Sequence, residues 1–302
     1  MYDVIYWGNI PLHWPLCALC ALVCAGLYAL LARRAGLRTA AAMTHAAFSA
    51  VIGLFLARAI YAAVNWYNIF LDEMGEFAGL GTFFDLTTGS MNVIGFLAGL
   101  LIAAPIAARL TKTSVPSLLD ASAVPAMAMY ILARAIEPLT GQGYGDFMEM
   151  EVCVCWLEAA LTAVLLAVCV LFLRRKCRKP GTFFQYALAL WCLTQILPES
   201  LRCDEALFVL IFARVTHLGL AVTLGLVLIR LLVAYRSCLT GKAVAADAVG
   251  LAAGLGLAIG SIFALDKTNW PKPLVYLLMI AAILWLGAVI CRRIRWADHL
   301  SK

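Results

Sequence analysis

Nine long apolar segments, separated by short polar stretches, dominate this chain of 302 residues. A helix needs about 20 consecutive apolar residues to cross the hydrocarbon core of a bilayer. The segments are Trp14–Leu31, Ala41–Val64, Val93–Ala108, Pro116–Ile136, Val152–Leu173, Thr182–Leu197, Leu207–Leu232, Ala246–Leu265 and Val275–Cys291. They predict an all-α polytopic membrane protein with about nine transmembrane helices.

The composition leaves no room for a large soluble domain. Hydrophobic residues make up 64% of the chain and charged residues 13%, whereas soluble domains carry about 25% charged residues. The net charge of +6 comes from short basic clusters between apolar segments, not from a basic face of the kind that binds nucleic acid. Most of the 11 cysteines lie inside apolar segments, where cysteine behaves as a small hydrophobic residue.

Charge alternates from one connection to the next. One set of connections and the carboxyl terminus carry most of the Lys and Arg residues: Arg33, Arg34, Arg38, Arg109, Lys112, Arg174, Arg175, Lys176, Arg178, Lys179, Arg230, Arg236, Lys242, Arg292, Arg293, Arg295 and Lys302. The other set is acidic: Asp72, Glu73, Glu76, Asp85, Asp146, Glu149, Asp204 and Glu205. Because basic loops stay in the cytoplasm, the pattern predicts an amino terminus outside and a carboxyl terminus in the cytoplasm.

The stretch Asn65–Asn92 is long for a membrane loop and rich in aromatic residues. Aromatic side chains at this density are typical of a segment that lies in the membrane interface. We therefore expect residues 65–92 to form an arm on the outer leaflet, with a plain extracellular loop as the alternative.

Charged residues also occur inside the apolar segments: Arg58, Asp120, Arg134, Glu158 and Arg214. A charge at membrane depth is costly unless it is paired or hydrated, so such residues often face an internal cavity and carry function. The alternative is a structural ion pair, for instance between Arg58 and Glu158.

Arg134 differs because it stands at the outer end of its segment. Glu137, Pro138 and the glycine-rich stretch Thr140–Gly145 follow it directly. Proline ends the helix, and the glycines let the backbone turn tightly and approach a ligand. A guanidinium at this depth suits a phosphate group, whose oxygens it binds two at a time. The alternative is an arginine that snorkels to the interface.

A second outer cluster contains Gln195, Glu199 and Arg202. Residues at this spacing share a helix face where the helix continues, although Pro198 lies between them. Arg202 is expected either to neutralise Glu199 or to contact a lipid phosphate.

In these stretches the chain resembles bacterial prolipoprotein diacylglyceryl transferase. The core pattern of that family is an arginine followed by Ile-Gly-Asn-Phe and then Asn-Gly-Glu-x-Tyr-Gly. The matching residues here are Arg134, Gly141, Tyr144 and Gly145, with Gln142 in place of the family glutamate. Other matches follow the same order along Leu12 to Leu232: Arg58 with Tyr61, Asp120 with Pro125, Glu158, and Glu199 with Arg202.

The chain departs from the family pattern at four places. The family's His-Gly-Gly corresponds to Ser90-Met91-Asn92, and the asparagine after the core arginine corresponds to Glu137. A second functional arginine corresponds to Gln195, and a tyrosine of the first span to Pro15.

The resemblance implies transfer of a diacylglyceryl group from phosphatidylglycerol to the lipobox cysteine of an exported prolipoprotein, at the bacterial cytoplasmic membrane and without a metal or cofactor. It implies the catalytic residues Arg134, Glu137 and Glu199. The implied substrate-binding residues are Arg58, Tyr61, Ser90, Asn92, Gly141, Gln142, Tyr144, Gly145, Glu158, Gln195 and Arg202.

The resemblance also divides the chain into a transferase-like core of seven helices, residues 1–235, and two additional helices, residues 236–302. The glycines of Gly250–Gly260 allow close helix packing in the second part. Two other functions stay open. One is a homologue without this activity that binds lipid or a membrane partner. The other is a small transporter in which Arg58, Asp120, Glu158 and Arg214 line a pathway.

Overall fold

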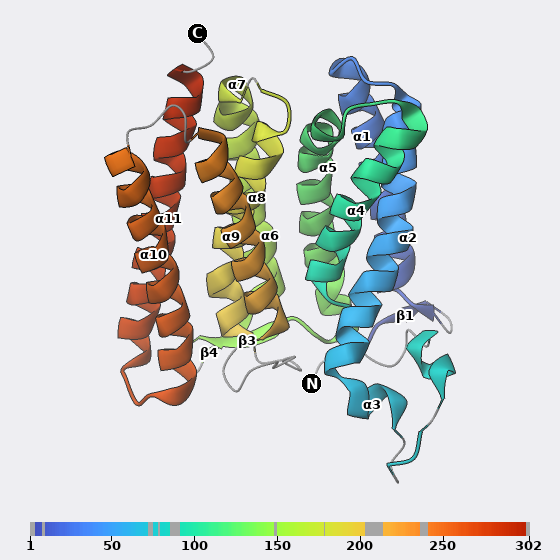
Figure 1. Ribbon diagram of the computed structural model, residues 1–302. Coiled ribbons are helices and arrows are strands. Elements are labelled where there is room, and N and C mark those ends of the chain that lie inside the picture. The colour runs from blue at the N-terminus through green and yellow to red at the C-terminus, as the bar shows by residue number, and fades with distance from the viewer. Residues whose placement is uncertain are drawn as a thin grey trace.

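A computed structural model describes residues 4–7, 10–71, 75–77, 79–84, 91–147, 150–177, 179–202, 214–235 and 241–299. Within these ranges, nine long helices run back and forth between the two ends of a bundle (Figure 1). They are α1 (His13–Arg34), α2 (Thr39–Val64), α4 (Val93–Thr111), α5 (Val115–Ile136), α6 (Val154–Val168), α8 (Thr182–Leu201), α9 (Val215–Tyr235), α10 (Gly241–Lys267) and α11 (Lys272–His299). The prediction of an all-α polytopic membrane protein is confirmed.

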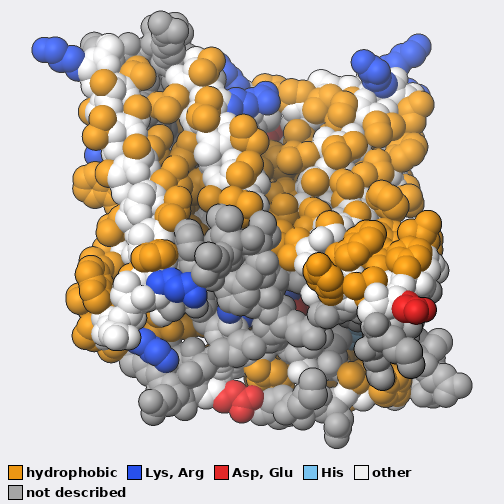
Figure 2. All heavy atoms as spheres, turned by 60° about the horizontal axis from the view of Figure 1, so that its bottom comes forward, with side chains coloured by type: hydrophobic (Ala, Val, Ile, Leu, Met, Phe, Trp, Pro, Cys, Tyr) orange, Lys and Arg blue, Asp and Glu red, His pale blue; other side chains and the backbone are white. Residues whose placement is uncertain are grey.

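Eight of the nine long helices in the described part of the chain are long and apolar enough to cross a membrane, and α8 is the exception. Most residues of α8 are buried, and the helix packs against α5, α6, α9 and α11. Its polar residues Gln195 and Glu199 are therefore surrounded by protein, not lipid. The sides of the bundle, in contrast, are covered by hydrophobic side chains (Figure 2), such as Leu22 and Leu284.

Two helix boundaries differ from those expected. The segment expected from Val152 begins as strand β4 (Met150–Cys153), and α6 starts only at Val154. The helix expected from Leu207 starts at Val215 in the structure, and residues 207–213 lie outside the described ranges. Beyond α6, the same span continues as a π-helical turn, η3 (Cys169–Leu173), and a last turn, α7 (Arg174–Lys176).

The two ends of the bundle differ in structure and charge. One end, here called the basic end, carries the exposed arginines 33, 34, 38 and 109. The opposite end, here called the hairpin end, carries all the short elements apart from η3 and α7 (Figure 1). These are β1 (Tyr6–Trp7), β2 (Ile10–Pro11), α3 (Trp66–Phe70), η1 (Leu80–Phe84), η2 (Glu137–Thr140), β3 (Tyr144–Phe147) and β4. Antiparallel pairs join β1 to β2 and β3 to β4.

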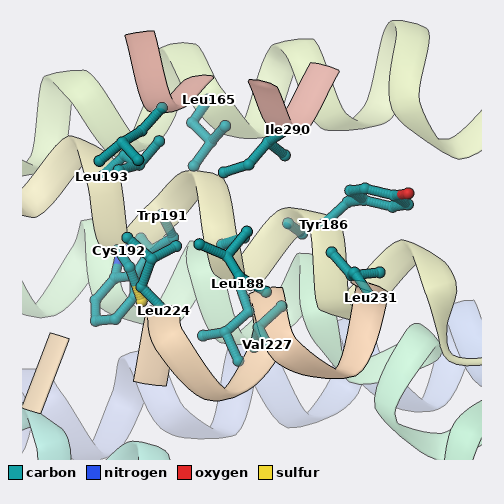
Figure 3. Close-up of a cluster of buried hydrophobic side chains, with 14 of the residues drawn as sticks. Leu165, Tyr186, Leu188, Trp191, Cys192, Leu193, Leu224, Val227, Leu231 and Ile290 are labelled. Carbon is teal, nitrogen blue, oxygen red and sulfur yellow. The ribbon is translucent and has the colours of Figure 1, made fainter. Parts of the chain in front are cut away.

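The largest hydrophobic core surrounds α8 (Figure 3). Tyr186, Cys192 and Leu193 of α8 are buried against α6, α9 and α11. At the basic end, the Asp120 carboxylate accepts hydrogen bonds from the backbone N–H groups of Gly181 at 2.5 Å and Phe184 at 2.8 Å. These donors lie at the start of α8, where a helix leaves its N–H groups without internal partners. Asp120 of α5 thus caps α8 from another helix.

Helices α2 and α4 approach each other through small residues spaced four apart. A Cβ atom added to Gly99 would lie 2.3 Å from the Gly53 Cα atom, and one added to Gly95 would lie 2.2 Å from the Ala57 nitrogen. Small residues at this spacing let membrane helices pack backbone to backbone. By contrast, the Gly250–Gly260 run makes one comparably close approach, between Gly254 and Leu286.

This contact leads to a stability prediction. We expect Gly99→Ala to lower the free energy of unfolding by about 1–3 kcal/mol, because overpacking at a backbone contact forces the helices apart. Gly26→Ala is the matched control, since nothing lies within 4 Å of an added Cβ atom there. Thermal unfolding in detergent would measure both variants. Equal midpoints for the two would contradict the prediction.

Candidate functional site

Four charged side chains form a closed ring at the hairpin end. Arg134 Nε lies 2.6 Å from Glu158 Oε2, and Arg134 Nη1 pairs with Glu137 Oε2. Arg202 Nη2 lies 2.8 Å from Glu137 Oε1, and Arg202 Nη1 lies 3.4 Å from Glu158 Oε1. Each carboxylate therefore bridges the same two guanidinium groups. We call these four residues the ion ring.

The backbone at the hairpin end brings the ion ring together from three helices. Helix α5 ends at Ile136, and η2 begins at Glu137, directly before Pro138. The chain then turns through Gly141 and Gly143, whose positive φ values of 74° and 89° are typical of glycine. Strand β3 follows and leads through β4 into α6, which carries Glu158.

Gly145 explains why Arg202 lies in the ion ring. Gly145 forms an antiparallel bridge with Arg202, directly after the end of α8. A Cβ atom at this position would lie 2.1 Å from the Leu201 carbonyl oxygen. Within the glycine-rich stretch, Gly145 approaches the backbone at Leu201 and Gly143 approaches the Cys155 side chain.

The ion ring continues into the bundle through a chain of polar side chains. The Tyr130 hydroxyl lies 3.1 Å from Glu158 Oε2 and 2.7 Å from Gln195 Oε1. Gln195 Nε2 donates to the hydroxyl oxygens of Thr162 and Thr194, each at 3.1 Å. Gln195 was predicted to bind substrate. The structure places it behind the ion ring, where it positions Tyr130.

The four side chains of the ion ring differ in how far they are exposed to solvent. The exposed fraction of the side chain is 2% for Glu158 and 19% for Glu137, with Arg134 at 14% and Arg202 at 10% between them. The two arginines and two glutamates balance in charge, which suits a buried site, because an unpaired charge there is costly. Glu158 thus lies at the inner side of the ion ring and Glu137 at its outer side.

A second polar group lies at the end of α8, where the Glu199 side chain is buried. Arg214 donates to the backbone oxygens of Glu199 and Arg202. On the facing start of α9, His217 Nε2 lies 3.2 Å from the Ser200 hydroxyl oxygen, while His217 Nδ1 is buried and has no hydrogen-bond partner among the described residues. Arg202, which was expected to neutralise Glu199 or to contact a lipid phosphate, forms its described ion pairs with Glu137 and Glu158.

Arg58 and Tyr61 lie in a different polar group, at the foot of the predicted arm. Arg58 Nε donates to the Phe83 carbonyl oxygen at 2.9 Å, and its Nη2 to the Thr82 carbonyl oxygen at 3.2 Å. The Arg58 guanidinium also lies 5.6 Å from the centre of the Tyr61 ring. The ion pair between Arg58 and Glu158 that we considered from the sequence does not form, because Glu158 pairs with the two arginines of the ion ring. Arg58 instead fastens η1 to α2.

Three other predicted site residues can be located, and one cannot. The Asn92 side chain accepts from the Ile94 N–H at 2.9 Å and so caps α4, while its Nδ2 lies 3.4 Å from the Thr216 hydroxyl oxygen. Tyr144, on β3, is partly buried, and burial raises the pKa of its phenol. Gln142 is partly buried beside it in the glycine turn. Ser90 lies outside the described residues.

Sequence analysis missed Tyr130 and His217. Tyr130 lies one helical turn before Arg134, a spacing that places both on one face of α5, so it could have been found. His217 follows the connection that begins after Arg202. Because α8 and α9 are antiparallel neighbours, residues on either side of this connection lie at the same level.

No protein-family model matches this chain, and no match to it is found among curated proteins.

Proposed function

We propose that this protein is a divergent phosphatidylglycerol–prolipoprotein diacylglyceryl transferase, integral to the bacterial cytoplasmic membrane. One observation supports the proposal most strongly: the guanidinium groups of Arg134 and Arg202, from different helices, meet at one carboxylate, that of Glu137. Two guanidinium groups that face a single anion are suited to a phosphate, whose oxygens each planar group can bind in pairs. The sequence resemblance around Arg134 suggests phosphatidylglycerol as the lipid that carries this phosphate.

The proposed orientation places the amino terminus outside and the carboxyl terminus in the cytoplasm. It is supported by the exposed arginines 33, 34, 38 and 109 at the basic end, since basic loops remain cytoplasmic. The ion ring lies at the opposite end and would then open toward the outer leaflet. An exported prolipoprotein would present its lipobox cysteine on that side.

In the proposed reaction, a thiolate of the prolipoprotein attacks the glyceryl carbon that bears the phosphate. A carbon–sulfur bond forms, the carbon–oxygen bond to the phosphate breaks, and glycerol phosphate leaves with the bonding electron pair. Arg134 and Arg202 would stabilise the charge that develops on the leaving phosphate. The thiol proton must pass to a base, because the thiolate is the nucleophile. Either Glu137 or Glu199 is the proposed acceptor, in place of the histidine that the family pattern has.

The test is a direct assay of this reaction. Purified protein in phosphatidylglycerol vesicles is incubated with a lipobox peptide, and mass spectrometry follows the thioether-linked peptide and free glycerol phosphate. We expect both products in equal amounts, and neither with a peptide whose cysteine is replaced by serine. Absence of thioether product from well-folded protein would reject the transferase function.

A homologue that binds lipid without this chemistry is the second candidate. It is favoured by the charge balance of the ion ring, because both guanidinium groups already have carboxylate partners. Binding of phosphatidylglycerol without any thioether product would support it. The transporter candidate has less support, because Asp120 caps α8 at the basic end whereas Glu158 and Arg214 lie at the hairpin end.

A further inference from the structure

The two carboxylates of the ion ring make equivalent ion pairs but differ in their surroundings. Glu158 is almost fully buried on a regular helix, and its Oε2 atom also lies 3.1 Å from the Tyr130 hydroxyl. Glu137 is the most exposed member of the ion ring and begins the short turn η2, which ends at Gly141 in a left-handed conformation. Of the two, Glu137 is therefore the carboxylate that is partly exposed to solvent, whereas Glu158 is enclosed.

The position of the Glu137 carboxylate matches what a phosphodiester would need. One of its oxygens meets Arg134 and the other lies 2.8 Å from Arg202. A phosphodiester also has two free oxygens that share one negative charge, and guanidinium groups bind both kinds of anion in this way. We propose that Glu137 is an internal anion that occupies the phosphate position, and that a phosphodiester headgroup binds by displacing it from Arg134 and Arg202.

Charge explains why such an exchange is feasible. With Glu137 in place the ion ring is neutral and offers no net attraction to an anion. When Glu137 moves out, the two guanidinium groups and Glu158 leave one positive charge, which a phosphodiester with one negative charge then balances. The buried site keeps the same total charge before and after the exchange, so the high cost of an unbalanced buried charge is avoided. The protein thereby limits its own affinity for the lipid.

This inference rests on the proposed function for the class of lipid. It adds that the Glu137 side chain occupies the binding site when no lipid is bound. Glu137→Gln tests it, because glutamine keeps the shape but cannot neutralise two guanidinium groups. We expect the affinity for short-chain phosphatidylglycerol to rise by about tenfold, as for the loss of a competing close ion pair. Glu137→Asp keeps the charge but shortens the side chain, and should give a smaller gain. Isothermal titration in detergent would measure each affinity.

Three controls make the test specific. Glu151→Gln changes an exposed carboxylate on the neighbouring strand β4 and should leave the affinity unchanged. Glu137→Gln combined with Arg202→Gln should lose the gain, since the second guanidinium is removed. Titration with glycerophosphoglycerol, the same phosphodiester without acyl chains, separates a free phosphodiester from a lipid headgroup: a gain for this ligand alone would reject the lipid and retain the anion exchange.

The outcomes separate this inference from the transferase proposal. Tighter lipid binding by Glu137→Gln without thioether product from any variant would uphold the displaced carboxylate and reject the transferase. Thioether product from the unaltered protein, with no gain in affinity for either Glu137 variant, would do the reverse. Unchanged or weaker phosphatidylglycerol binding by both variants, each with an intact melting transition, would overturn the inference.

Discussion

Replacing Arg134 with alanine should lower the rate of the proposed diacylglyceryl transfer by roughly a hundredfold to a thousandfold, the usual loss when one preorganised donor to a developing anion is removed. Arg134 contacts both carboxylates of the ion ring, so its guanidinium group would contact any phosphate that binds there. The rate of thioether formation, measured at saturating lipid, is the quantity to compare.

Two further variants separate catalysis from folding. Arg134→Lys keeps the positive charge that Glu158 needs, but an ammonium group cannot replace the planar fork of arginine. We therefore expect a folded protein with an intermediate rate. Arg109→Ala removes an exposed arginine at the basic end and should leave the rate within about twofold, as for surface changes far from a site. A folded Arg134→Ala protein with the full rate would remove the basis of the proposed mechanism.

The largest loss of stability is expected for Glu158→Ala. Its carboxylate is 2% exposed and pairs with both arginines of the ion ring. Without it, two buried guanidinium groups share the single charge of Glu137. Breaking a buried ion pair from one side costs about 3–5 kcal/mol, so the thermal midpoint in detergent should fall clearly. Glu151→Ala, at an exposed carboxylate of the same end, should change stability by less than about 0.5 kcal/mol.

A double variant tests whether this loss comes from unpaired charge. Arg134→Ala combined with Glu158→Ala removes one charge of each sign and leaves Arg202 paired with Glu137. Residues that share an ion network are not additive, so the double variant should be less destabilised than the sum of the two single variants. Strictly additive losses would mean that lost packing, not charge, explains the effect of Glu158→Ala.

The bundle itself could be predicted from local pattern. The length of an apolar segment determines whether a helix can cross a membrane, and each helix satisfies its own backbone hydrogen bonds. The end of α5 was equally predictable, because Pro138 and the glycines after it stop a helix whatever surrounds them. Of the nine long helices in the described part of the chain, only α8 is not apolar enough for a membrane span, since a helix enclosed by other helices can carry groups such as Gln195 and Glu199.

Ion pairs between different helices were not predictable from local sequence pattern, unlike pairs within one segment. Arg134 and Glu137 are close in the chain, and their pairing could have been proposed from spacing alone. Glu158 and Arg202 join them only because the faces of α5, α6 and α8 meet at one level and Gly145 lies against the backbone at Arg202. From sequence, Arg58 was an equally good partner for Glu158, and Asp120 an equally good candidate for a pathway.

Side-chain hydrophobicity and backbone geometry act over a few residues, so the sequence alone determines which segments form long helices and which polar residues interrupt them, but not the strand β4 that precedes α6. An ion pair depends on distances between side chains of different helices, which change with every rotation or shift of one helix against another. Only the packing of this bundle therefore decided that Arg134 is held by two carboxylates, that Arg58 holds the segment around Phe83, and that Asp120 caps α8.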